Sequence, residues 1–161
     1  MRMKSLGKSV RVAAVSVGLV MGALATGAHA QYTKAHIYPT VEAAQPDINA
    51  ALMQARHEHK RVILDFGGDW CGDCQVLNIY FHQSPNADLL AKNFILVDVN
   101  IGHMDQNVEL AKRYGVPLNG VPALAVLSPT GKVIYSQNKE FSDMRHMEPQ
   151  SVTDFLNKWK R

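Results

Sequence analysis

The pattern of apolar and polar positions predicts alternating helices and buried strands along most of the chain. Residues 62–66 and 94–99 are nearly continuous apolar runs, which is typical of strands covered on both faces. Apolar or small residues recur with the spacing of one helix face between Ile48 and Ala55. A last amphipathic helix is predicted by one stripe of large apolar residues, namely Val152, Phe155, Leu156 and Trp159.

The remaining pattern completes this alternation. The further predicted elements are a helix from Cys71 to about Phe81 that ends before Ser84-Pro85, a helical turn at 88–92, a helix capped by Asp105 that continues to Tyr114, and strands at 123–127 and 132–135. A turn at 128–131 should join the last two strands into a hairpin, because Pro and Gly stand where a type I turn favours them. We therefore expect an α/β fold, a mixed sheet with helices on both faces.

The first thirty residues have the features of a secretory signal peptide. Basic residues precede an apolar stretch at 12–28, and small residues flank His29 at the two positions that a signal peptidase reads. We expect cleavage after Ala30, then an extended segment at 31–46 and one domain at 47–161. An uncleaved anchor is the alternative, although the apolar stretch is close to the lower length limit for crossing a membrane.

The charge balance changes when this segment is removed. The full chain has 17 Lys and Arg against 14 Asp and Glu, but residues 1–30 hold four of the basic residues and none of the acidic ones. The mature chain has 13 against 14, a formal charge of −1, which does not favour nucleic acid or a membrane surface as a partner. We expect a periplasmic or secreted monomer without stable membrane association.

Both cysteines of the chain lie in one motif at residues 70–74, directly after the predicted strand at 62–66. A helix that begins at Cys71 favours a thiolate there through its unpaired N–H groups and its dipole. Cys74 lies one turn further on the same side, so it can form a disulfide with Cys71. Closing so short a ring adds little stability, and the bond therefore suits repeated opening.

Three other interpretations of this cysteine pair stay open. They are a structural disulfide, a zinc site and an inert buried pair. A zinc site needs distant His ligands because the chain has no second Cys pair. Trp70 and Gly72 favour an exposed, tight turn over an inert pair. The residues favour a redox centre.

Residues 48–159 resemble the thioredoxin superfamily. The positions that carry the resemblance are Asp65, Phe66, the Trp-Cys-Gly-Asp-Cys motif at 70–74, Gly120, Val121 and Pro122. The Asp lies six residues before the first Cys, and the Pro follows that Cys by about fifty residues. The resemblance implies the thioredoxin fold with a C-terminal hairpin and helix, and a cis peptide bond before Pro122, which faces the disulfide.

The resemblance also implies a mechanism. Cys71 attacks a substrate disulfide, and Cys74 then resolves the mixed disulfide. Asp65 is an acid in an apolar strand, so we expect burial to raise its pKa and expect it to take the proton from Cys74; a structural ion pair is the alternative. Substrate contacts are expected from Trp70, Gly72, Asp73, the backbone of Val121, and Pro122.

Asp73 stands where thioredoxins usually have proline. A carboxylate beside Cys71 disfavours the thiolate. We therefore expect a reductant or an intermediate exchanger, because strong oxidants stabilise the reduced thiolate form. If Asp73 points into water, it has little effect. Asp69 is expected to be a solvated turn residue.

Together these features predict a thiol–disulfide oxidoreductase that needs no cofactor or metal. Its partners would be exported proteins with thiols or disulfides, and a second redox protein that recycles it. One alternative is a copper-handling metallochaperone, because two thiolates suit Cu(I); His82, His103 and residues 144–147 are its candidate further ligands. Another is a non-catalytic, peptide-binding adaptor.

Overall fold

The computed structural model describes residues 34–137 and 139–161, so the predicted signal peptide and its cleavage site lie outside the described residues. Helices and strands alternate along the described chain as the hydrophobic pattern predicts. In chain order the elements are η1 (Val41–Ala43), α1 (Ala44–Glu58), β1 (Arg61–Gly67), α2 (Gly72–His82), α3 (Asn86–Asn93), β2 (Phe94–Asn100), α4 (Val108–Arg113), β3 (Ala123–Leu127), β4 (Val133–Gln137), η2 (Met144–His146) and α5 (Gln150–Trp159).

The strands form a mixed sheet in the order β2-β1-β3-β4. β1 and β2 are parallel because the helices α2 and α3 connect them in a crossover. β3 runs antiparallel to both β1 and β4. In the turn between β3 and β4, the N–H of Gly131 donates to the carbonyl oxygen of Ser128 over 2.9 Å. The predicted α/β fold and hairpin are confirmed.

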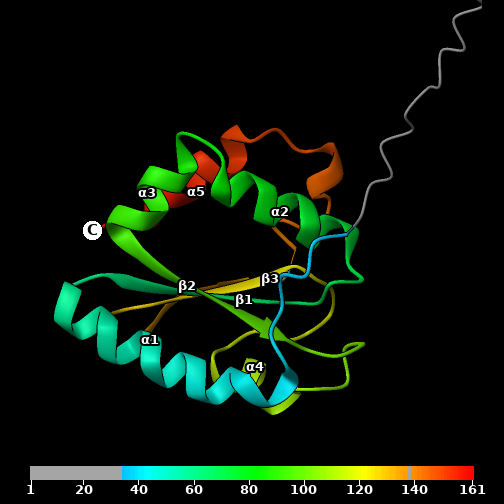
Figure 1. The fold of residues 1–161 in the computed structure, drawn as a ribbon, viewed down its shortest axis with the longest axis horizontal. Coiled ribbons are helices and arrows are strands. Elements are labelled where there is room, and N and C mark those ends of the chain that lie inside the picture. Colours follow the sequence, from blue (N-terminus) through cyan, green and yellow to red (C-terminus); the bar gives the residue numbers. More distant parts are fainter. Residues whose placement is uncertain (1–33, 138) are drawn as a thin grey trace, which may run out of the picture. The chain divides into compact units, whose positions relative to one another are not determined.

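Helices cover both faces of the sheet, as Figure 1 shows. α1 and α4 lie on one face, whereas α2, α3 and α5 lie on the other. The α1 face is packed by Ile48, Ala51, Ala55, Val62, Leu64 and Phe66. The α2 face is packed by Ile63, Leu77, Phe81, Met144, Phe155 and Leu156. β1 contributes alternate residues to the two cores, so its side chains connect the helix layers.

Two helix starts differ from the predicted ones. The segment expected to be extended up to residue 46 is helical from Val41, and α1 begins at Ala44; Pro46 falls in the first turn of α1, where proline is tolerated. The predicted cap of α4 at Asp105 is wrong. Asn107 precedes that helix in a left-handed conformation, with φ of 52°, and its amide donates to carbonyl oxygens of two other segments. Asp105 instead accepts a hydrogen bond from the N–H of His103.

The last helix buries the stripe that the spacing predicts. Val152, Phe155 and Leu156 are buried, and Trp159 packs at the edge of the same core against Tyr135, with ring centroids 4.6 Å apart. In the described ranges, none of the helices combines the length and the apolar character that crossing a membrane requires.

Candidate active site

Cys71 and Cys74 form a disulfide at the N-terminus of α2. Their Cα atoms are 5.2 Å apart, and the backbone N–H of Cys74 donates to Sγ of Cys71 over 3.1 Å. One of the free donors at the helix start therefore points at this sulfur, where it would stabilise a thiolate after reduction. Cys71 is 5% exposed and Cys74 is 0% exposed, so an attacking group reaches Cys71 first.

The peptide bond between Val121 and Pro122 lies opposite the disulfide. It is cis, as the resemblance implies. The carbonyl oxygen of Val121 is 3.8 Å from Sγ of Cys71, and the Val121 side chain packs against the cluster of Tyr38, Cys71 and Cys74. The segment before β3 thus places a backbone acceptor next to the sulfur that an extended substrate would reach.

Trp70 lies at the rim of the disulfide with its ring held in place. Its Nε1–H donates to the carbonyl oxygen of Gly102 over 2.6 Å, and the ring stacks on His103 with centroids 5.6 Å apart. The side chain is still 39% exposed. It offers an apolar surface beside Cys71, which is where the sequence predicts a substrate contact.

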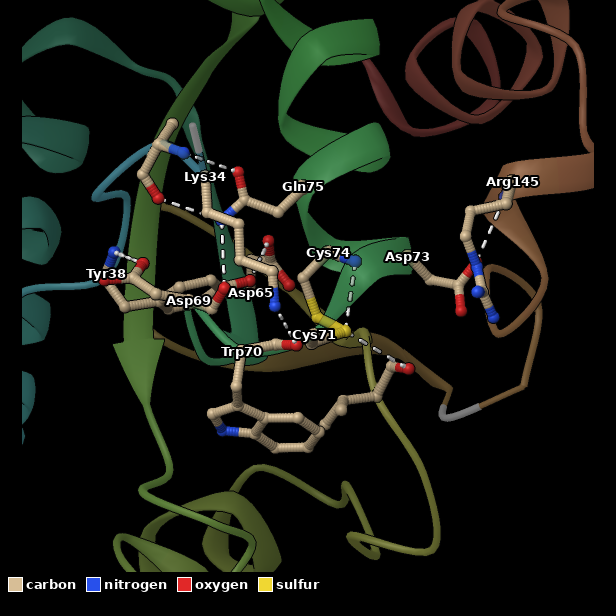
Figure 2. The surroundings of a disulfide bond; sticks show 12 residues. Lys34, Tyr38, Asp65, Asp69, Trp70, Cys71, Asp73, Cys74, Gln75 and Arg145 are labelled. Atoms are coloured by element: carbon tan, nitrogen blue, oxygen red, sulfur yellow. Dashed lines mark hydrogen bonds and ion pairs between the residues drawn. A yellow bond between two sulfur atoms is a disulfide. The ribbon is translucent and has the colours of Figure 1, made fainter. Parts of the chain in front are cut away.

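Asp73 is buried, with only 8% of its surface exposed, so the interpretation that it points into water is wrong. Its Oδ1 accepts hydrogen bonds from the backbone N–H of Arg145 over 3.0 Å and from Nε of Arg145 over 3.1 Å. Arg145 belongs to η2 and also lies against Gly72. Figure 2 shows this pair to the right of the disulfide. The guanidinium offsets part of the Asp73 charge that Cys71 meets.

Asp65 is buried near the carboxyl end of β1, and Figure 2 shows it beside the two cysteines. Its Oδ2 accepts a hydrogen bond from the Tyr38 hydroxyl over 3.0 Å. Burial raises the pKa of Asp65 well above its usual range, the neighbouring Asp98 adds to this rise, and the Tyr38 hydrogen bond opposes it. The rise of the Asp65 pKa agrees in direction with the expectation from the sequence, and within residues 34–137 and 139–161 no basic side chain forms an ion pair with Asp65.

The segment at residues 34–38 lies beside α2 and is fixed by two polar side chains. The amide of Gln75 forms two hydrogen bonds with the backbone of Ala35, of 3.1 and 2.9 Å. Asp69 accepts from the N–H groups of Ile37 and Tyr38. Partial burial raises the pKa of Asp69, but these N–H groups and His36 lower it by more, so it lies below its usual value. Asp69 lies in a turn, as expected, but it is only partly exposed and anchors this segment.

Sequence reasoning missed two residues at this site, Tyr38 and Asp98. Asp98 carries the same signal that marks Asp65, a single acid within an apolar strand, and so could have been found. Tyr38 lies in a segment without periodic pattern, and nothing in its local sequence places it under the cysteines.

In the described part of the chain, the candidate copper ligands His82, His103 and Met144 lie in surroundings other than the thiols. Across residues 34–137 and 139–161, no group of three or more His, Cys, Asp or Glu side chains is placed to hold a metal ion. His82 lies at the far end of α2 from Cys71, and His103 stacks on Trp70. Met144 is fully buried in the core beneath α5.

The fold and the Cys-x-x-Cys disulfide define the class of thioredoxin-like proteins, and comparison with known proteins agrees. The sequence matches the thioredoxin-like family over residues 43–129, more than half of the chain. The chain therefore belongs to the thioredoxin-like family.

Among curated proteins, the chain is similar to thiol:disulfide interchange proteins named DsbD. It is 30% identical to DsbD of Pseudomonas fluorescens over 113 residues, which cover 69% of this chain and 19% of that protein. It is 28% identical to DsbD of Escherichia coli over 105 residues, with coverage of 65% and 18%. The chain spans about a fifth of the length of these relatives.

Among solved structures, the chain is similar to a disulphide isomerase from Xylella fastidiosa. The identity is 35%, the TM-score is 0.71, and the match covers 77% of this chain and 98% of that one. The germline-specific thioredoxin Deadhead of Drosophila melanogaster is 18% identical with a TM-score of 0.52, covers 72% of this chain and 94% of that one, and shares the fold.

Proposed function

We propose that this protein is a thiol–disulfide oxidoreductase that exchanges disulfides of exported proteins through Cys71 and Cys74. Its role is that of a reductant or an intermediate exchanger. The observation that carries the proposal is the disulfide at the N-terminus of α2, where the more accessible sulfur faces the Val121 carbonyl and the inner sulfur lies above a buried acid. A structural disulfide needs neither feature. The relatives named as interchange proteins and as an isomerase support the same chemistry.

The proposed reaction has two steps. In the first, the Cys71 thiolate attacks a substrate disulfide and releases one substrate thiolate, forming a mixed disulfide. In the second, Cys74 loses its proton, attacks Sγ of Cys71 and releases the second substrate thiolate. The substrate gains two electrons and the Cys71–Cys74 disulfide forms. A reducing redox protein then restores both thiols, and we propose that it docks at the same Trp70 and Val121 surface.

Insulin reduction with dithiothreitol as the electron source tests this function. We expect the wild-type protein to accelerate insulin precipitation and Cys71→Ser to abolish the acceleration. Cys74→Ser should lose turnover and accumulate a mixed disulfide that a reducing agent cleaves. The matched control is the double variant Cys71→Ser/Cys74→Ser, which has no thiol and should trap nothing. Normal turnover in either single variant would refute the assigned roles.

The proposed site of action is outside the cytoplasm, either the periplasm or the medium. It rests on the pattern of residues 1–30, which predicts a signal peptide cleaved after Ala30. Mass spectrometry of the protein recovered from an extracytoplasmic fraction tests this. The expected mature chain begins at Gln31, and a chain that retains residues 1–30 would contradict the proposed cleavage.

A further inference from the structure

Three oxygen-bearing side chains cluster on the α2 face of the sheet, and they come from three different segments. They are Tyr38 before η1, Asp65 in β1 and Asp98 in β2. Asp65 and Asp98 are register partners in the parallel pair, so their side chains project from the same face of the sheet. Figure 2 shows Asp65 and Tyr38 to the left of the disulfide, opposite the Asp73–Arg145 pair.

One oxygen of each carboxyl group has no partner. Oδ1 of Asp65 and Oδ1 of Asp98 are buried, and no residue in the described part of the chain donates a hydrogen bond to either. Burying a carboxylate oxygen without a donor costs much more free energy than burying the same group in its neutral, protonated form. The cluster is therefore an environment that retains a proton.

Gly67 brings this cluster into reach of the inner sulfur. A Cβ atom added at Gly67 would lie less than 3.0 Å from both the Tyr38 side chain and Sγ of Cys74. Tyr38 and Cys74 thus share the space above Gly67, and Tyr38 in turn donates to Asp65. A larger residue at this position would separate the hydroxyl group from the sulfur.

We propose that Tyr38 and Asp98 are positioning residues that set, in opposite directions, how readily Asp65 exchanges a proton with Cys74. This inference rests on the proposed function, because it concerns the proton that accompanies opening of the disulfide. Tyr38 acts through the hydrogen bond that it donates to Asp65, which favours the carboxylate. Asp98 acts through its charge, which favours the protonated form of Asp65.

Reduction of the Cys71–Cys74 disulfide requires a proton as well as electrons. A thiolate of the reducing partner attacks Sγ of Cys71 and forms an intermolecular disulfide. The Cys71–Cys74 bond breaks, and its electron pair remains on Sγ of Cys74. Asp65 gives its proton to that sulfur, which leaves a neutral Cys74 thiol and an Asp65 carboxylate. In the reverse direction, the carboxylate takes the proton back when Cys74 attacks the mixed disulfide.

The charged groups around the cluster also affect the protonation equilibrium of Asp65. Burial raises the pKa of Asp98 to about 6, Asp69 adds to this rise, and His82 at the end of α2 opposes it. Burial also raises the pKa of Tyr38 well above its usual value, with further increases from the nearby carboxyl groups, so Tyr38 stays a hydrogen-bond donor at neutral pH. Asp98 is less deeply buried than Asp65, so its charge is better solvated and favours retention of the proton on Asp65.

The test is the pH dependence of disulfide reduction by dithiothreitol in the full chain, with each rate divided by the concentration of dithiothreitol thiolate. The corrected rate should fall as Asp65 ionises, over a scan from about pH 5 to about pH 10. Tyr38→Phe removes a donor to the Asp65 carboxylate, so the midpoint of the pH profile of its corrected rate should move to higher pH. Asp98→Asn removes a negative neighbour, so its midpoint should move to lower pH. At pH 8 the corrected rates of the two variants should differ by about threefold or more.

Tyr80→Phe is the matched control, because its hydroxyl also donates a hydrogen bond, to the carbonyl oxygen of Met147, but lies away from the cluster. Its midpoint should equal that of the wild type. Carbon-13 NMR titration of the Asp65 carboxyl group compares the same midpoints without any rate measurement. It also applies to a variant whose stability is reduced. Midpoints that coincide in all variants, or that move in the same direction, would overturn the inference.

Failure of the proposed function gives a different result. Dithiothreitol reduces the disulfide whether or not the protein acts on other proteins. Active insulin reduction with unshifted midpoints would refute the roles of Tyr38 and Asp98 alone. Opposed shifts would support these roles, and an absence of insulin reduction in the same preparation would refute the oxidoreductase function.

Discussion

The two faces of β1 are built differently at the same depth in the protein. Towards α1, the strand presents Leu64 and Phe66, which are fully buried among other apolar side chains. Towards α2, the alternate positions are Asp65 and Gly67, a buried acid and a residue without a side chain. One face contributes apolar contacts. Beyond the buried Ile63, the other face gives up such contacts and carries a group whose ionisation costs free energy.

This difference indicates which face was shaped by stability and which by chemistry. Burying a carboxyl group without a basic partner destabilises a fold, and natural proteins tolerate such departures mainly at functional sites. The cysteines, the segment before β3 and the Tyr38 side chain all meet on the α2 face near the end of β1. The α1 face is then the scaffold that keeps this arrangement in place.

Leu64→Ala should give the largest effect, and only on stability. Removing a fully buried Leu side chain from the α1 face should lower the free energy of unfolding by about 2–5 kcal/mol. Urea denaturation measures the loss, and the rate of thiol exchange per folded molecule should stay the same. A changed pH profile of exchange in the folded variant would mean that the two faces are not independent.

Asp65→Asn, one position along the strand, should have the opposite effect: the rate of thiol exchange should fall, and the stability of the fold should change little. The amide has nearly the same shape but cannot exchange a proton with Cys74, so exchange at pH 7 should slow by about tenfold to a hundredfold. The fold should persist, because the substitution removes an acid that forms no ion pair and leaves no buried charge behind. Stopped-flow kinetics with a small disulfide substrate measures the rate. Unchanged rates across about pH 6–8 would remove Asp65 from the mechanism.

Asp98 should make the stability of the protein depend on pH. Burial raises its pKa to about 6 in the folded state, so the folded protein holds the proton more tightly than the unfolded chain. The resulting stability is fully present below the unfolded pKa of about 4 and is lost as the pH rises through about 6. Asp98→Asn should reduce this loss by on the order of 2 kcal/mol in urea denaturation at several pH values. An equally steep loss in the variant would contradict the assignment.

The smallest effects should come from the Asp73–Arg145 pair at the rim. Arg145→Ala leaves the Asp73 carboxylate unopposed beside Cys71, which disfavours the thiolate and should lower the reduction potential by about 10–30 mV. Asp73→Asn should raise it by a similar amount, because the guanidinium then faces the sulfur alone. Equilibration with glutathione measures both. Shifts of the same sign in the two variants would show that the pair acts through packing and not through charge.

The sequence was sufficient to predict the sheet, its helices and the cysteine pair. These follow from hydrophobic spacing and from one compact motif, both of which are local along the chain. The helix through Phe81, the hairpin around Gly131 and the stripe of α5 agree with prediction for this reason. The prediction of a cap at Asp105 failed because the position of Asn107 before α4 depends on contacts with distant segments, which no local pattern shows.

The partners of the site could not be predicted in the same way. Arg145 reaches Asp73 across 72 positions of the chain, and Tyr38 reaches Asp65 across 27. Neither contact has a periodic or motif signal, because each depends on how a loop folds over the sheet. The anchoring roles of Asp69 and Gln75 could not be predicted for the same reason, since the segment that they bind has no regular secondary structure.

The most direct test of the central claim is the reduction potential of the Cys71–Cys74 pair, equilibrated with glutathione buffers and read by alkylation of the free thiols. A reversible centre that serves as a reductant or exchanger should have a potential between about −270 mV and about −180 mV. A value below about −300 mV is typical of structural disulfides and would contradict a catalytic role. A value near −120 mV, typical of a strong oxidant, would contradict the proposed direction of exchange.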